Sequence, residues 1–427
     1  MLKIAYLANT FPSDVEPYVS DEIRELKRRG VIVVTGSVRA PKLGVVSNVG
    51  PEIIVQLHRI SIISAALWLC VTRFRRLAPL LFRVLFCGRE SLLQRLKAIA
   101  HTSLGACYAA QLREHAVDHI HVHHGYFGSW IAMVAARLLD VGFSLTLHGS
   151  DLLLHATYLD VKLAECSFCM TVSEYNRRFI LEHYPSVDQE KIVVTRMGVD
   201  LPRDLPLKPK SHGMDPSCLN ILSVGRLHAV KDHAFLVHAC AHLAASGVRF
   251  ECSIAGDGPE RASLESLIRQ LGVAHNLHLL GHVPREQIGS LYDHADIVLL
   301  TSRSEGIPLV LMEAMARAKI VLAPAITGIP ELVIPGKTGF LYEPGSMHDF
   351  VQCLLFIHSV LIHETEGKWA GPGKPDLFRW IRHAARTQIQ HNFNRSKNLD
   401  AFANCFVNRI VSVREMSANE NLVLQQI

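Results

Sequence analysis

The sequence predicts an α/β protein made of two parallel-sheet halves, and three observations support this. The 427 residues exceed what one core usually holds, since domains run roughly 100–200 residues each. Strand-like and helix-like stretches alternate along the chain, which is typical of parallel sheets covered by helices. The alternation breaks at residues 201–218, which are dense in Pro, Lys and polar residues, and then restarts, so we expect a linker there.

Each half supplies enough strands for a sheet of its own. The strands and helices expected in the first half are Ile4–Leu7, Ser20–Arg29 (helix), Ile120–His123, Ser129–Leu139 (helix), Phe143–Leu147, Cys169–Val172, Glu174–His183 (helix) and Ile192–Thr195. Those expected in the second half are Ile221–Val224, Asp232–Ala245 (helix), Phe250–Ala255, Pro259–Leu271 (helix), His278–Leu280, Arg285–His294 (helix), Asp296–Leu300, Pro308–Ala318 (helix) and Ile320–Ala323. Ligands of such sheets gather at the carboxyl ends of the strands.

The division of the chain follows from these elements. We expect an N-terminal Rossmann-like domain over 1–203, a linker over 204–217 and a second Rossmann-like domain over 218–385. The remaining residues, 386–427, have a helical pattern, best developed over 388–413, and we expect this segment to pack back on the first domain.

Composition limits the class and the compartment. Apolar residues make up 49% of the chain, and no low-complexity tract indicates disorder. The ten cysteines lack a disulfide spacing, which is typical of a reducing compartment, and Cys166 and Cys169 are better explained as buried thiols than as half of a zinc site. The opening residues predict a first strand rather than a signal peptide. We therefore expect a cytoplasmic protein, and the mild net charge of +5 suggests no nucleic acid partner.

Positive charge is concentrated between residues 57 and 100. This segment holds eight Lys or Arg and one acid, interspersed with apolar residues such as Trp68, Phe82 and Phe86. Its uncharged run, 60–72, is shorter than the roughly 20 residues that span a bilayer. Two interpretations stay open: helices that lie on the anionic inner face of the cell membrane, or helices packed on a sheet with solvated arginines outside.

The stretch from Ser304 to Met315 carries the strongest functional pattern. It follows an expected strand, and Pro308 stands where a proline suits a helix start. Glu305 therefore falls on a strand-to-helix turn, beside the free amides of the new helix, and such a turn can bind phosphate. Glu313 lies further along the helix, where its carboxylate can accept hydrogen bonds from sugar hydroxyls. Together these features indicate a sugar joined to a diphosphate.

A basic pair follows the first strand of the second half. Gly225 allows close backbone approach, and Arg226 and Lys231 would reach the same strand edge as Glu305. Arg can bond two phosphate oxygens and Lys adds a point charge, so the pair could neutralise a departing diphosphate without a metal ion. Residues 256–258 lack the third glycine of a dinucleotide fingerprint, and we expect only a structural turn there.

Histidines gather at one strand end of the first half. His119, His121 and His123 would share one face of a strand, but no acid or cysteine beside them completes a metal site, so we expect none. His148 and Asp151 follow the next strand, at the functional edge of the sheet. We expect His148 to hydrogen-bond a sugar hydroxyl or to lie at the reacting centre. Asn9, Glu16 and Tyr18 belong to the loop after the first strand, and Tyr18 could instead pack on the following helix.

These motifs together resemble a retaining glycosyltransferase of family 4 with the GT-B fold, in which two Rossmann-like domains face each other across a cleft. The resemblance extends from Ile4 to about Tyr342, and the opening segment is similar to members that build bacterial exopolysaccharide or colanic-acid-type glycans. The segments that carry it are 10–12, His148-Gly149-Ser150-Asp151, 173–176, 197–200, Gly225-Arg226-Leu227 with Lys231-Asp232, Glu305 with Glu313, and 328–332.

The resemblance implies roles for these residues. Arg226 and Lys231 would hold the donor diphosphate, Glu313 the ribose hydroxyls, and Glu305 the donor sugar near the reacting carbon. His148 would lie by the anomeric carbon, which makes His148 and Glu305 the expected catalytic residues. Further donor contacts are expected from Gly225, Gly306, Ile307, Pro308, Leu309, His282 and Val283. Acceptor contacts are expected from Asn9, Glu16, Tyr18 and Asp151.

The implied reaction moves a sugar from a nucleotide-sugar donor to a glycan or lipid-linked acceptor, with retained anomeric configuration and no cofactor. Two alternatives remain open. A nucleotide-sugar 2-epimerase of the same fold would act on the donor without an acceptor. A non-catalytic, membrane-associated scaffold would keep the fold and lose donor binding. The identities of base, sugar and acceptor, the linkage and the oligomeric state leave no readable motif.

Overall fold

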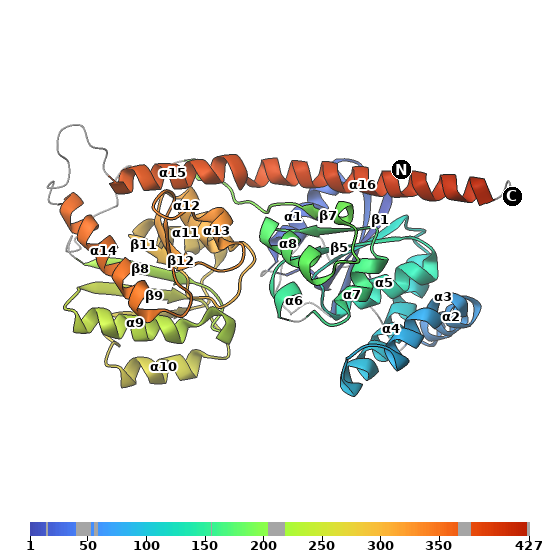
Figure 1. The fold of residues 1–427 in the computed structure, drawn as a ribbon, viewed down its shortest axis with the longest axis horizontal. Coiled ribbons are helices and arrows are strands. Elements are labelled where there is room, and N and C mark those ends of the chain that lie inside the picture. The colour runs from blue at the N-terminus through green and yellow to red at the C-terminus, as the bar shows by residue number, and fades with distance from the viewer. Residues whose placement is uncertain are drawn as a thin grey trace. The chain divides into compact units, whose positions relative to one another are not determined.

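The computed structural model describes residues 1–13, 16–39, 53–54, 59–154, 156–203, 218–365 and 377–424. The chain divides into two compact units, Met1–Arg196 with Leu399–Ile427, and Met197–Asn398 (Figure 1). The expected linker, 204–217, lies outside the described residues. The segment that returns to the first unit begins at Leu399, later than the expected residue 386, because the preceding helix packs in the second unit.

The first unit contains a sheet of seven strands in the order β3-β2-β1-β4-β5-β6-β7. Every neighbouring pair is parallel, as the alternation of strands and helices predicts. The strands are β1 (Lys3–Thr10), β2 (Ile32–Arg39), β3 (Ile53–Ile54), β4 (His119–His123), β5 (Gly142–Leu147), β6 (Phe168–Thr171) and β7 (Ile192–Val194).

Helices cover both faces of this sheet, and alternate residues of β1 point to the two cores: Ala5 and Leu7 to one, Ile4 and Tyr6 to the other. The helices on the Ala5 face are α2 (Ile60–Thr72), α3 (Phe74–Phe86), α4 (Leu92–Arg113), α5 (Phe127–Leu139), α6 (Ser150–Leu153), α7 (Leu159–Glu165) and α8 (Glu174–His183). The Tyr6 face is covered by α1 (Pro17–Arg28) and by the C-terminal helix α16 (Arg395–Leu424).

The helical pattern near the C-terminus forms two helices, α15 (Leu377–Asn392) and α16, rather than one. The break falls at Phe393 and Asn394, where the backbone hydrogen-bonds to Val199. The Val199 amide donates to the Phe393 carbonyl at 2.9 Å, and the Val199 carbonyl accepts from the Arg395 amide at 3.1 Å. Beyond the break, Phe406 of α16 packs in the same core as Tyr6.

The second unit contains a parallel six-stranded sheet in the order β10-β9-β8-β11-β12-β13. Its strands are β8 (Leu219–Val224), β9 (Phe250–Ala255), β10 (Leu277–Gly281), β11 (Ile297–Leu299), β12 (Ile320–Pro324) and β13 (Phe340–Tyr342). The helices α9 (His233–Ala245), α10 (Arg261–Gln270) and α14 (Met347–Thr365) share one core, while α11 (Arg285–His294), α12 (Leu309–Ala316) and α13 (Ile329–Leu332) share the other. Helix α15 contributes to both.

The basic segment forms α2, α3 and the first turns of α4. One side of α2 and α3 packs against the helices α4 and α5, and residues such as Leu69, Leu77 and Val84 join the core of the Ala5 face. The other side, which we call the α2–α4 surface, exposes Ile60, Leu67, Trp68, Val71, Phe74, Phe82, Leu85, Phe86, Leu92, Leu93 and Leu96. In the described part of the chain, no helix combines the length and apolar content needed to span a bilayer.

Candidate active site

In the second unit, the carboxyl edge of the sheet is organised around an ion pair. Lys231 ends the short 3-10 turn η2 (Ala229–Lys231) after β8, and Glu305 lies on the turn between β11 and α12. Lys231 Nζ donates to Glu305 Oε1 at 2.5 Å. A threonine hydroxyl holds the backbone of each residue. Thr301 Oγ1 donates to the Lys231 carbonyl at 2.9 Å, and Thr327 Oγ1 donates to the Glu305 carbonyl at 2.6 Å. The cation and its partner are therefore held on the turns that follow two adjacent strands, β8 and β11.

The start of α12 lies directly after this pair. Pro308 is the residue before the helix, with φ −74° and ψ 124°, and Leu309 is the first helical residue, one position later than expected; the helix ends at Ala316. Its first amides have no acceptor within the helix, which suits an anion. The Ile307 side chain is buried in the core, so Gly306 and Ile307 can offer a ligand only backbone groups.

Glu313, on the second turn of α12, accepts a hydrogen bond at Oε2 from the Tyr292 hydroxyl at 2.9 Å. Tyr292 of α11 is buried, and burial, followed by the Glu313 charge, raises its pKa well above the usual value, so it remains a neutral donor. Because Glu313 is only partly buried, its carboxylate remains accessible to a ligand. The sequence pattern did not single out Tyr292.

The loops after β8, β9 and β10 are packed backbone against backbone. A Cβ on Gly256, whose φ is +151°, would lie 1.8 Å from the Gly225 carbonyl oxygen, and one on Gly258 would lie 2.3 Å from the Leu227 carbonyl oxygen. The Gly256 amide also donates to the Gly281 carbonyl at 2.8 Å. The turn at 256–258 is thus structural, as predicted.

This packing brings three of the predicted donor residues to one edge of the sheet. Arg226 follows Gly225 and is exposed, and His282 and Val283 follow Gly281, the first exposed and the second partly buried. The donor residues of the second unit therefore lie on loops or turns at the carboxyl ends of β8, β10 and β11, apart from Leu309 and Glu313 in α12.

Several buried polar atoms at the same edge have no hydrogen-bond partner among the described residues: Ser223 Oγ, Ser302 Oγ, Ser304 Oγ and both ring nitrogens of His233. Burial, followed by the Lys231 charge, lowers the His233 pKa to about 4, so its ring is neutral. Unsatisfied buried polar groups are rare in folded proteins and call for a partner. A polar ligand or ordered water at this edge would supply one.

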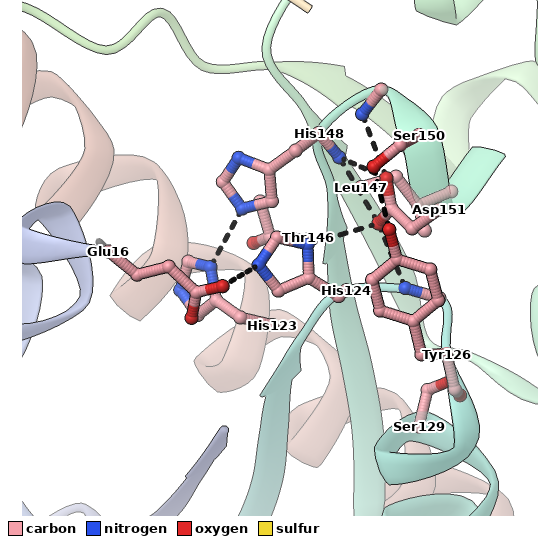
Figure 2. A network of polar contacts seen from close by, with 12 residues as sticks. Glu16, His123, His124, Tyr126, Ser129, Thr146, Leu147, His148, Ser150 and Asp151 are labelled. Carbon is pink, nitrogen blue, oxygen red and sulfur yellow. Dashed lines mark hydrogen bonds and ion pairs between the residues drawn. The ribbon is translucent and has the colours of Figure 1, made fainter. Parts of the chain in front are cut away.

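At the carboxyl edge of the first unit's sheet, His124 is flanked by two carboxylates (Figure 2). His124 Nε2 lies 3.0 Å from Glu16 Oε1, and His124 Nδ1 lies 3.5 Å from Asp151 Oδ2. Burial alone would lower the His124 pKa, but these two partners outweigh it and raise the pKa to about 10. The ring is therefore an imidazolium at neutral pH. The Tyr18 hydroxyl lies 3.3 Å from His124 Nε2.

Asp151 differs from its expected role as an acceptor contact. Its side chain is fully buried and accepts hydrogen bonds from the amides of Gly125, His148 and Gly149 at 2.9, 3.1 and 2.8 Å. Burial opposes ionisation, but the bond to His124 and these amides leave its pKa lowered. Asp151 therefore shapes the loops that carry His124 and His148 and has no surface for a substrate.

His148, one of the two expected catalytic residues, is partly buried. Its ring lies tilted against the rings of Tyr18 and His124, with centroids 4.7 and 4.5 Å away. His148 Nε2 lies 2.9 Å from His123 Nδ1, and the His148 carbonyl accepts from Asn176 Nδ2 at 2.8 Å. The ring and the backbone are both held in place.

The other two histidines of β4 pair with hydroxyl groups. His119 Nε2 and His121 Nδ1 lie 2.7 and 2.8 Å from Ser144 Oγ, and His121 Nε2 lies 3.1 Å from Thr146 Oγ1. Burial lowers the pKa of His119 to about 3 and that of His121 well below its usual value, so both rings are neutral. His119 and His121 thus form buried hydrogen bonds between the neighbouring strands β4 and β5.

Two further residues complete the edge. Asn9 lies at the end of β1 with its Oδ1 buried and without a partner among the described residues, close to Gly128 at the start of α5. Lys162 of α7, which the sequence did not single out, is buried and donates to the carbonyls of Gly125, Tyr126 and Thr157 at 2.6, 3.2 and 2.9 Å. Burial lowers its pKa to about 7.

Comparison with known proteins identifies the family. A model described as "Glycosyltransferase Family 4" matches residues 15–203, and one described as "Glycosyl transferases group 1" matches residues 207–358. The amylovoran biosynthesis glycosyltransferase AmsK of Erwinia amylovora is 32% identical over 306 residues, which cover 68% of this chain and 70% of AmsK. The chain belongs to glycosyltransferase family 4. It is therefore an enzyme of the glycosyltransferase class, as the motifs implied.

Other similar proteins align over less of their length or at lower identity. The putative colanic acid biosynthesis glycosyltransferase WcaL of Salmonella typhimurium is 40% identical over 158 residues, which cover 36% of this chain and 38% of WcaL. The solved structure of HepE from Anabaena, in complex with UDP and glucose, has a TM-score of 0.64 at 17% identity and covers 96% of this chain and all of its own. The fold expectation of two Rossmann-like parallel sheets, GT-B, is confirmed.

Proposed function

We propose that this family member transfers a sugar from a nucleotide-sugar donor to a glycan or lipid-linked acceptor during the biosynthesis of a surface polysaccharide. The observation that carries the proposal is the Lys231–Glu305 pair, set beside the free amides of α12. Relatives named for amylovoran and colanic acid biosynthesis support the polysaccharide product. The bound UDP and glucose of HepE support a nucleotide-sugar donor.

The donor would bind at the carboxyl edge of the second sheet. Lys231 and Arg226 supply positive charge for the diphosphate, and the first amides of α12 supply hydrogen-bond donors, which is the combination that phosphate groups prefer. Glu313, partly buried and braced by Tyr292, would accept hydrogen bonds from the ribose hydroxyls. Glu305 would accept hydrogen bonds from the sugar. The unpartnered hydroxyls of Ser302 and Ser304 fit a polar ligand at this edge.

The proposed transfer retains the anomeric configuration. The bond between the anomeric carbon and the diphosphate oxygen breaks, and an acceptor hydroxyl forms the new glycosidic bond on the same face of the sugar. The proton of that hydroxyl passes to the departing diphosphate. Arg226, Lys231 and the helix start would stabilise the charge that develops on the leaving group, so the step needs no metal ion. His148 and Glu16 of the first unit are proposed to contact the sugars.

We further propose that the enzyme acts at the cytoplasmic face of the membrane. The α2–α4 surface exposes aromatic side chains, with Trp68, Phe82 and Phe86 at 53%, 60% and 73% of their full exposure. Exposed basic residues accompany them, including Arg73 and Arg75. Apolar side chains next to basic ones suit the anionic headgroup region of a bilayer. A lipid-linked acceptor would be presented at that surface.

A donor screen tests the function. The protein is incubated with single nucleotide-sugars, UDP-sugars first, with and without lipid-linked acceptor extracted from a polysaccharide-producing bacterium, and the products are identified by mass spectrometry. Transfer predicts a nucleoside diphosphate and a lengthened acceptor only when both substrates are present. Conversion of the donor to its 2-epimer without acceptor would favour the epimerase instead. If no donor in the panel binds, the proposal fails and the scaffold alternative gains support.

A further inference from the structure

A chain of hydrogen bonds runs from the core of the first unit to His148. It begins at Tyr6 of β1, whose hydroxyl donates to Glu22 Oε2. His123 Nε2 lies 2.9 Å from the same carboxylate oxygen and 2.8 Å from the Tyr6 hydroxyl. The opposite nitrogen of His123, Nδ1, lies 2.9 Å from His148 Nε2. Tyr6, Glu22 and His123 are buried, and only His148 reaches the surface.

The triangle formed by Tyr6, Glu22 and His123 determines which nitrogen of His123 carries a proton. A carboxylate only accepts hydrogen bonds, and a phenol donates one. If His123 Nε2 lacked a proton, the single Tyr6 proton would face two acceptors, Glu22 Oε2 and His123 Nε2, whose lone pairs would then face each other at 2.9 Å. If Nε2 carries a proton, both Tyr6 and His123 donate to Glu22. The geometry therefore favours a proton on His123 Nε2.

The tautomer of His123 then fixes that of His148. An imidazole that carries a single proton, on Nε2, presents a lone pair at Nδ1, and the 2.9 Å contact then makes His148 Nε2 the donor. We propose that Glu22 and His123 are positioning residues that hold His148 with its proton on Nε2 and its lone pair on Nδ1. His148 thereby accepts a hydrogen bond from a substrate hydroxyl. This inference rests on the proposed function for the identity of the substrate, but not for the tautomer.

The surroundings of His148 agree with a neutral, fixed acceptor. The His148 Nδ1 has no partner among the described residues, and Figure 2 shows no bond to that nitrogen. Asp151 and Asn176 hold the His148 amide and carbonyl, and the rings of Tyr18 and His124 lie tilted against the imidazole. Burial and then the positive charge of His124 lower the His148 pKa well below its usual value. A charged His148 would donate from both ring nitrogens and could not accept a hydrogen bond from a substrate hydroxyl.

Nitrogen NMR of the full chain, labelled with ¹⁵N at histidine, tests the tautomer without substrate. The His148 signals are assigned by their loss in His148→Asn. The inference predicts a protonated Nε2 and an unprotonated Nδ1 at neutral pH. A wild-type His148 with its proton on Nδ1, or with both nitrogens protonated, would overturn it. This spectrum decides the tautomer even if the Glu22 variant does not fold.

Two variants test whether Glu22 sets the tautomer. The amide of Glu22→Gln can donate to His123 Nε2, which removes the preference and should give His148 a population protonated on Nδ1. Tyr6→Phe leaves the Glu22–His123 bond in place and should keep the wild-type tautomer. An unchanged His148 spectrum in Glu22→Gln would refute the positioning role.

Kinetics connect the tautomer to the reaction. Glu22→Gln should lower kcat about tenfold, the effect of one lost neutral hydrogen bond, with little change in the donor KM. Glu182→Gln, the same change on the exposed side of α8, is the matched control and should leave kcat unchanged. A shifted tautomer with an unchanged kcat would refute the substrate contact. If no transfer activity exists at all, the proposed function fails while the NMR result still decides the tautomer.

Discussion

The ammonium group of Lys231 lies 2.5 Å from a carboxylate oxygen of Glu305, although 74 positions separate them in the chain. The contact arises because β8 and β11 are adjacent and parallel, so the loops that follow them meet at one edge. Without a ligand, Glu305 compensates the charge of Lys231. A bound diphosphate would share that charge, and donor affinity therefore depends on the two residues together.

The first prediction concerns this coupling. Lys231→Ala should weaken nucleotide-sugar binding by about 1–3 kcal/mol, because a charged contact to the diphosphate is lost. Glu305→Gln should weaken it less, since removal of the carboxylate also removes its repulsion of the phosphates. The double variant should depart from additivity by about 0.5–3 kcal/mol, measured by titration calorimetry. Strictly additive losses would contradict a shared site.

The second prediction concerns the ribose contact. Glu313→Ala should weaken nucleotide-sugar binding by about 1–3 kcal/mol, since charged hydrogen bonds to the hydroxyls disappear. Tyr292→Phe removes only the hydrogen bond from the Tyr292 hydroxyl to Glu313, and it should weaken nucleotide-sugar binding by a smaller amount. Calorimetry with the nucleoside diphosphate and with its 2′-deoxy analogue provides the check. If the 2′-deoxy analogue loses as much in Glu313→Ala as the ribose form does, Glu313 does not contact that hydroxyl.

The third prediction follows from the raised pKa of His124, about 10 in the folded protein against roughly 6.5 for an unfolded histidine. Its stabilisation is fully present below pH 6.5 and is lost as pH rises through 10. His124→Gln should cost about 3 kcal/mol of unfolding free energy at pH 6, because Asp151 and Glu16 lose a charged partner. Denaturant unfolding from pH 6 to pH 10 checks this: the gap between wild type and variant should shrink as pH rises. A gap that widens would contradict the assignment.

The fourth prediction concerns membrane binding. The wild-type protein should co-sediment with anionic vesicles at low salt and less so as salt rises, because screening shortens from about 10 Å at 0.1 M to about 3 Å at 1 M. The triple variant Trp68→Ser, Phe82→Ser, Phe86→Ser should lose most of this binding. Exposed aromatics of the second unit provide a matched control, Phe356→Ser with Trp380→Ser, which should bind as wild type does. Absence of wild-type co-sedimentation at low salt would remove the membrane proposal.

The fifth prediction concerns metal dependence. If Arg226, Lys231 and the start of α12 neutralise the leaving diphosphate, chelation of divalent cations with EDTA should leave the transfer rate unchanged. Added Mg²⁺ or Mn²⁺ should not raise it more than about twofold, a change well under 1 kcal/mol in the barrier. A rate that collapses with EDTA and returns with one cation would show that these residues do not suffice.

Much of the fold was predictable because its signals are local. The strands β4, β5 and β9 and the helices α8 and α11 lie where the sequence predicted them, each within one residue at either end. The strand β2 and the long helix α14 were missed. The pattern at the C-terminus gave no sign of the break between α15 and α16, because that break depends on Val199, nearly 200 residues earlier in the chain.

The candidate site was only partly predictable for the same physical reason. Glu305 and Lys231 follow apolar runs that mark their strands, so their shared edge could be expected. Glu22 and Tyr292, by contrast, occupy ordinary helical positions, and their hydrogen bonds to His123 and Glu313 exist only through tertiary packing. The full burial of Asp151, which overturned its expected acceptor contact, likewise depends on loops from different strands.

The donor site can be tested with a crystal structure of the protein with a bound nucleotide-sugar. We expect the diphosphate oxygens within hydrogen-bond distance of Lys231 Nζ, the Arg226 guanidinium and the first amides of α12, with the ribose hydroxyls on Glu313. A nucleotide-sugar bound with its diphosphate away from these groups would show that the donor site lies elsewhere.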